Sequence, residues 1–132
     1  MRFETRANSR LFAELARSLT RAGIAVRFRA HGRSMYPAIA DGELVQVEAP
    51  EADPQRGDVV MTECDSGIRV HRATQAGTAI RTQGDCCFEE DGANSQLIGA
   101  VKIVDNGGLR SVGPQRLGSK LRRWVACLRG RF

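Results

Sequence analysis

The chain has 132 residues, which can bury one modest core but not two independent ones. It contains no run of about 18 apolar residues and no apolar leader, so we expect neither a transmembrane helix nor a signal peptide. The four cysteines lack C-x-x-C spacing and paired histidines, and no glycine-rich phosphate loop is present. We therefore expect no metal, no cofactor and a reducing, cytoplasmic location, with free thiols.

The first expected element is an amphipathic helix from about Ser9 to Ala22, within an N-terminal part that spans residues 1–23. Asn8 or Ser9 would cap it, and Gly23 would end it. Four apolar residues fall on one side of it: Leu11, Phe12, Leu15 and Leu19.

The sequence of the body, residues 24–113, predicts a set of short strands. Apolar and polar residues alternate over 24–30, the period of a half-buried strand, and this strand ends at Gly32, where a turn carrying Ser34 begins. Further strands are expected at residues 44–48, 58–63, 68–73, 79–82 and 97–104. The chain is thus predicted to be a single, mainly β domain with an amphipathic helix at each end.

The C-terminal part, residues 114–132, carries the basic charge, because it contains six arginines and lysines and no acids in a chain of net charge +5. Its apolar residues follow one helical face: Leu117, Leu121, Trp124, Val125 and Leu128. Two interpretations stay open. The stripe packs on the domain and leaves the arginines in solvent, which we favour, or the helix docks peripherally on an anionic membrane. Nucleic acid is not an expected partner, since no recognition motif accompanies the charge.

Ser34 is the candidate nucleophile and His71 the candidate base. A serine that follows a glycine in a turn can become an activated nucleophile when a basic side chain from elsewhere in the sequence lies beside it. His71 lies 37 residues downstream in a predicted strand, which can bring its imidazole to the hydroxyl, whereas His31 is too close along the turn.

Five motifs in this order carry a resemblance: G-R-S-M-Y-P-A-I-A-D-G-E, Q-R-G-D-V-V-M, I-R-V-H-R-A, R-T-Q-G-D and L-I-G-A-V-K-I-V. Over roughly residues 26–104 the chain resembles the signal peptidase I and LexA-like serine peptidase superfamily. The resemblance implies the complex β-fold of that superfamily, with Ser34 as nucleophile. A histidine at the position of the family's base is similar to signal peptidases of the endoplasmic reticulum and archaea, here in a short, soluble form.

The same resemblance implies a third catalytic residue. The family's downstream acid matches Asp91, with Asp85 as the second choice. The only two lysines, Lys102 and Lys120, lie outside the family's lysine position, which argues against a Ser-Lys dyad. A histidine already accepts protons at neutral pH, since its ordinary pKa is about 6.5.

The oxyanion donors and the substrate contacts are also expected by resemblance. Gly32 stands where many signal peptidases have a serine donor, so the backbone N–H groups of Ser34 and Arg33 are expected to supply the oxyanion hole. Met35 and Pro37 would shape the path of a peptide that docks as an added β-strand, with small side chains next to the cut.

We therefore predict a serine endopeptidase of the signal peptidase type, whose partner is a peptide or precursor-protein substrate. The absence of a membrane anchor departs from signal peptidases. Two alternatives stay open: a LexA-like regulator that cleaves itself at Ala22–Gly23, and a non-catalytic domain that only binds peptides. Ala22–Gly23 lies close to Ser34 in the chain, which leaves few residues to fold back into the site.

Overall fold

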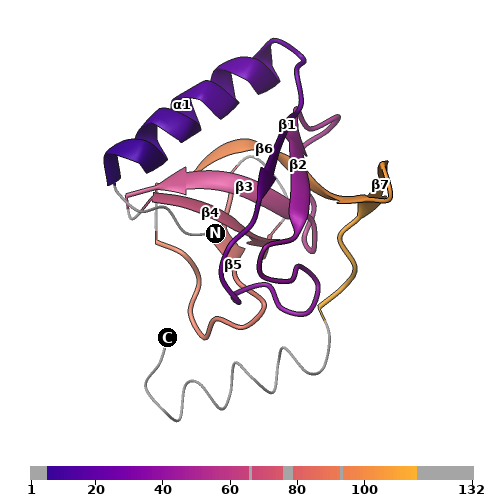
Figure 1. Ribbon diagram of the computed structural model, residues 1–132. Helices are drawn as coiled ribbons and strands as arrows, with labels where there is room; N and C mark the ends of the chain where they lie inside the picture. The colour runs from indigo at the N-terminus through magenta and orange to yellow at the C-terminus, as the bar shows by residue number, and fades with distance from the viewer. Residues whose placement is uncertain (1–5, 66, 76–78, 93, 116–132) are drawn as a thin grey trace.

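The computed structural model describes residues 6–65, 67–75, 79–92 and 94–115. In these residues, one helix packs against a strongly bent antiparallel sheet (Figure 1). The elements are α1 (Arg6–Arg21), β1 (Val26–Arg29), β2 (Leu44–Glu48), β3 (Val59–Cys64), β4 (Gly67–Ala73), β5 (Thr82–Gln83), β6 (Gln96–Asp105) and β7 (Gly108–Ser111). The mainly β prediction is confirmed. The predicted C-terminal helix lies outside the described residues.

Helix α1 starts earlier than expected. It begins at Arg6, so the expected N-cap at Asn8 or Ser9 is wrong. Ser9 is only 7% exposed and lies inside the helix, where its hydroxyl packs close to Gly67 at the β3–β4 turn. Gly23 does end the helix: its φ is 80°, and its N–H donates to the carbonyl of Thr20. This is the usual left-handed glycine at a helix C-terminus.

The strands are ordered β1-β2-β6-β3-β4-β5 in the sheet, and β7 pairs with β6. The long strand β6 pairs with β2, β3 and β7, while β1 and β5 lie at the two ends of the order. Figure 1 shows β1 and β2 crossing β3 and β4 steeply. This bend brings the loop after β1 below β4 and β5.

Close packing holds the bend and the helix in place. Ala13 and Ala16 are fully buried, which lets α1 lie directly on the sheet. Gly99 in β6 faces the backbone of β2 so closely that a Cβ atom there would be 2.5 Å from the carbonyl oxygen of Glu48. The central strands fill the core with branched aliphatic side chains: Val45, Val47, Val59, Ile68, Val70, Ile98, Val101 and Ile103.

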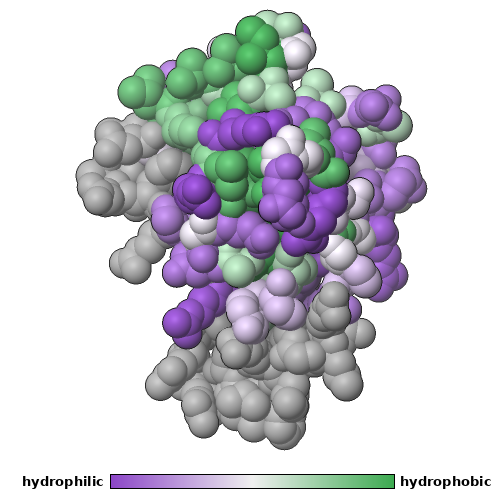
Figure 2. Space-filling model, turned by 45° about the vertical axis from the view of Figure 1, so that its right-hand side comes forward, coloured by the Kyte–Doolittle hydropathy of each residue, from purple (hydrophilic) through white to green (hydrophobic). Residues whose placement is uncertain are grey.

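The solvent-facing side of α1 carries exposed apolar side chains. Leu11 and Leu15, one helical turn apart, are 66% and 54% exposed, and Figure 2 shows hydrophobic residues gathered over this helix. Among the described residues, no helix is both long enough and apolar enough to cross a membrane.

Candidate active site

The turn that carries Ser34 is shaped by its glycine and by a carboxylate. Gly32 adopts a φ of 105°, which side chains other than glycine's rarely allow, and its N–H donates to Oδ1 of Asp41 at 2.9 Å. After the glycine the chain makes a helical turn, in which the N–H of Ile39 donates to the carbonyl of Met35. Ser34 thus lies at the start of a tight turn with its side chain half-buried.

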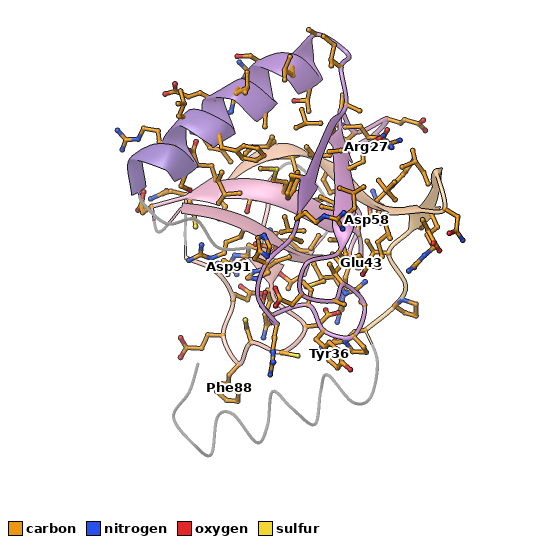
Figure 3. The ribbon with its side chains drawn as sticks, in the orientation of Figure 1. Arg27, Tyr36, Glu43, Asp58, Phe88 and Asp91 are labelled. Atoms are coloured by element: carbon orange, nitrogen blue, oxygen red, sulfur yellow. The ribbon has the colours of Figure 1, made fainter. Side chains whose placement is uncertain are left out.

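Three side chains from distant parts of the chain form one continuous line of hydrogen bonds. Ser34 Oγ lies 3.0 Å from Nε2 of His71, and Nδ1 of the same ring lies 2.6 Å from Oδ2 of Asp91. Ser34 comes from the loop after β1, His71 from β4, and Asp91 from the loop after β5. Figure 3 shows Asp91 on the side of the sheet away from α1.

The partners of His71 fix its tautomer. A carboxylate can only accept a hydrogen bond, so Nδ1 carries the proton and donates it to Asp91. Nε2 then bears a free lone pair and accepts the hydrogen bond from the hydroxyl of Ser34. The histidine is 4% exposed, so the sheet holds the ring in this orientation. This is the arrangement that activates a serine as a nucleophile.

Asp91 is held as a carboxylate. Burial raises the pKa of its carboxyl, but the hydrogen bond and charge of His71 lower it, the hydroxyl of Thr82 lowers it further, and Arg69 adds a favourable field. The net pKa lies below its ordinary value. The side chain is 12% exposed.

Gly84 forms the wall next to the serine and the histidine. A Cβ atom at this position would lie 3.0 Å from Nε2 of His71, 3.1 Å from Cβ of Ser34 and 2.6 Å from Sγ of Cys87. The backbone of the turn after β5 therefore approaches the two side chains as only glycine permits. The N–H of Cys86 donates to the carbonyl of Ser34 at 2.8 Å and ties this turn to the serine loop.

Asp85, the second choice for the third residue, lies elsewhere. Its carboxylate receives two hydrogen bonds from Arg72, at 2.8 and 2.9 Å, and is 1% exposed. The same guanidinium donates to the carbonyls of Gly57 and Gly113, and Gln115 donates to the carbonyl of Asp85. The structure thus places Asp91, and not Asp85, against His71, while Asp85 supports the turn behind Gly84.

The other expected site residues surround the serine in different environments. Met35 is 4% exposed, belongs to the core, and accepts a contact from the N–H of Asp85 at its sulfur. Pro37 is exposed and follows a cis peptide bond with Tyr36. Pro37 is therefore open to solvent, whereas Met35, expected to shape the path of a peptide, is buried in the core and lines no exposed surface.

The expected oxyanion donors are two backbone N–H groups of the serine turn. Within the described part of the chain, the structure assigns no acceptor to the backbone N–H of Ser34 or of Arg33. Both groups belong to the turn next to the hydroxyl. Donors of this kind, held in place before the reaction, stabilise the charge that forms on a tetrahedral intermediate.

Lys102 is engaged away from the site. Its Nζ pairs with Glu48 at 2.8 Å, and the hydrogen bond and charge of that carboxylate raise the pKa of the lysine. A lysine base needs the opposite shift. The second histidine, His31, is exposed and faces Asp41 at 3.6 Å. Among the described residues, His71 is the base that the geometry offers to Ser34.

A comparison with protein families identifies the group to which the protein belongs. The model of the family described as Peptidase S24-like matches residues 5–83. The chain belongs to the Peptidase S24-like family. The S24-like match includes Ser34 and His71, and Asp91 lies beyond it. It confirms the superfamily expected from the motifs and implies peptidase activity. No curated protein matches the chain.

Sequence reasoning did not find three residues of this S24-like site. Thr82 stood in the quoted R-T-Q-G-D motif, but only the fold shows that its hydroxyl reaches Asp91. Arg72 follows His71 directly, but only the fold shows that its guanidinium holds Asp85. Gly84 stood in a quoted motif, yet its contact with the serine and the histidine depends on the bend of the sheet. Among the described residues no cluster of metal-ligating side chains is found.

Proposed function

We propose that this S24-like chain is a serine endopeptidase of the signal peptidase type that uses a histidine base. The observation that carries the proposal is the unbroken line from the hydroxyl of Ser34 through the imidazole of His71 to the carboxylate of Asp91. A domain that only binds peptides has no need of this geometry. The paired Lys102 supports a histidine rather than a lysine base.

The reaction follows from the positions of these atoms. As Ser34 Oγ attacks the scissile carbonyl carbon, its proton passes to Nε2 of His71, and the imidazolium is stabilised by Asp91. The tetrahedral intermediate places its negative oxygen toward the backbone N–H groups of Ser34 and Arg33. When the C–N bond breaks, Nε2 returns the proton to the leaving amine.

The second half repeats these steps with water. His71 takes a proton from a water molecule, whose oxygen attacks the ester formed on Ser34. Breakdown of the second intermediate returns the proton to Oγ and releases the new carboxyl end of the peptide.

The substrate is a peptide or precursor protein. It would lie as an extended strand against the open edges beside the site, with Pro37 on the exposed rim. Tyr36 and Phe88 are 38% and 49% exposed, and Figure 3 shows both at the same lower end of the molecule. These rings supply apolar surface for such a chain.

Self-cleavage at Ala22–Gly23 finds less support. Both residues belong to the hydrogen-bonded end of α1, where their N–H groups donate to carbonyls of the last helical turn. A peptidase acts on an extended strand, so this end of the helix would have to unwind before the bond could enter the site. Intact mass after long incubation provides the check, because a product beginning at Gly23 would support the regulator.

The proposal is tested by cleavage of a pooled peptide library with small residues at alternate positions, followed by mass spectrometry. Wild type, Ser34→Ala and His71→Ala are compared in buffer, in detergent and with anionic vesicles. We expect discrete cuts with wild type alone. A surface variant, Ser95→Ala, serves as a matched control because Ser95 lies outside this line of hydrogen bonds. Equal cleavage by Ser34→Ala and wild type would refute the proposal, and no cleavage by any form would favour the peptide-binding alternative.

A further inference from the structure

We propose that Thr82 is a fourth member of the site, a positioning residue that acts through Asp91 and thereby orients His71. This inference rests on the proposed peptidase function, since it assigns a role within the same line of hydrogen bonds. Thr82 begins the short strand β5 and is 1% exposed.

The geometry joins Thr82 and Asp91 at two points. The hydroxyl of Thr82 donates to Oδ2 of Asp91 at 2.6 Å, and the N–H of Asp91 donates to the carbonyl of Thr82 at 2.8 Å. A side-chain bond and a backbone bond between the same two residues fix both the position of the loop and the rotation of the carboxylate. Asp91 comes from a loop, so a second anchor is what gives its side chain one orientation.

A single oxygen receives both neighbours. Oδ2 of Asp91 accepts from Thr82 and from Nδ1 of His71, each at 2.6 Å. A carboxylate oxygen has two lone pairs, so Oδ2 can accept both hydrogen bonds at once. If the hydroxyl is removed, the carboxylate is free to rotate, and the ring loses the fixed partner that keeps Nε2 aimed at the serine.

The hydroxyl of Thr82 helps to stabilise the negative charge of the buried Asp91 carboxylate. The carboxylate faces His71 and Arg69 from β4 and the neutral hydroxyl of Thr82 from β5. Burial works against its negative charge, and the hydroxyl offsets part of that cost. Without Thr82 the carboxylate loses a donor that stabilises its charge, so it is protonated at a higher pH. The charged state of Asp91 that the site requires is then lost earlier as the pH falls.

The test uses Thr82→Val, which keeps the branched shape and removes the hydroxyl, and Thr82→Ser, which restores it. We expect Thr82→Val to lower kcat by about 10- to 100-fold with little change in KM. The acidic limb of its pH profile should move to higher pH, and Thr82→Ser should return both toward wild type. A purely structural role would lower the amount of folded protein but leave the pH profile in place.

Thr74→Val is the matched control, since Thr74 makes a similar bond to the exposed carboxylate of Glu90. It should behave as wild type. If the wild type is active and Thr82→Val has the same rate and the same pH profile, the inference is wrong.

A second measurement separates this inference from the proposed function. The titration of the His71 ring and its Nδ1 proton are followed by NMR, which requires no cleavage. An inactive wild type in which Thr82→Val still alters the His71 signals would reject the peptidase and support the positioning role. Unaltered signals would overturn that role whatever the activity.

Discussion

Arg72 directly follows His71 in β4, so the two side chains leave opposite faces of the strand, and the guanidinium of Arg72 donates to both carboxylate oxygens of Asp85. Two neighbouring residues therefore hold two different acids, Asp91 on one face and Asp85 on the other. The His71–Asp91 pair belongs to the proposed catalytic line, and the Arg72–Asp85 pair supports the turn behind Gly84. The two acids should consequently respond differently to the same substitution.

Replacement of Asp85 by asparagine should mainly destabilise the fold. It leaves the guanidinium of Arg72 buried without a charged partner, and breaking such a pair costs about 3 to 5 kcal/mol of unfolding free energy. Urea denaturation measures the change. Asp105→Asn is the control, because its pair with Arg110 is half-exposed, and it should cost under about 1 kcal/mol. Equal losses for the two variants would contradict the structural role of Asp85.

Replacement of Asp91 by asparagine should mainly affect catalysis. The amide can donate to Nδ1, which favours the tautomer with the proton on the wrong nitrogen. We expect kcat to fall by about 10²- to 10⁴-fold, with the protein still folded by circular dichroism. Glu90→Gln, at the adjacent position, should keep its activity. If Asp91→Asn cleaves as fast as wild type, the third member has been assigned incorrectly.

Replacement of Gly84 by alanine should damage the site without straining the backbone, because the φ of Gly84 is not in the left-handed region. The added methyl group would press on Ser34, His71 and Cys87, and a displacement of about 1 Å at reacting groups can cost up to about 100-fold in rate. Kinetics of peptide cleavage measure the loss. Gly92→Ala, where a methyl group meets nothing within 4 Å, is the control. The double variant Gly84→Ala/Cys87→Ala should recover part of the activity.

The lowered pKa of Asp91 also predicts how the stability of the fold depends on pH. Its pKa in the folded protein lies below the ordinary 3.8, so its carboxylate stabilises the fold above that value, and the contribution is lost as the pH falls through the lowered pKa. The difference in unfolding free energy between wild type and Asp91→Asn should thus shrink from about pH 5 to about pH 3. Urea denaturation at both pH values checks this, and a difference that grows toward pH 3 would show the opposite shift.

Strands with several buried aliphatic residues were predictable from the sequence, and short or fully exposed strands were not. The strand expected at residues 44–48 coincides with β2, because its buried aliphatic residues carry the signal. Strand β7 was missed: all its residues are exposed, so no alternation marks it, although the positive φ of Asn106 and Gly107 fits a tight hairpin turn. The strand expected at 79–82 is shifted to Thr82–Gln83, since only two residues pair there.

The site was predictable as far as motifs reach. Ser34 and His71 stand in short strings with few competitors, so one serine and one base could be named. Asp85 and Asp91 lie in the same loop, and the sequence ranks them only by resemblance. What separates them is the side of β4 from which each is approached, and this depends on contacts between strands that no local pattern records.

The order of the strands determines when the candidate site can form during folding. Ser34 follows β1 at one end of the sheet, whereas Asp91 follows β5 at the other, and every intervening strand must pair before the two loops meet. A partly folded chain therefore lacks the contact of Ser34 and His71 with Asp91 on which the proposed cleavage depends. The proposed activity should appear only once the whole sheet has formed.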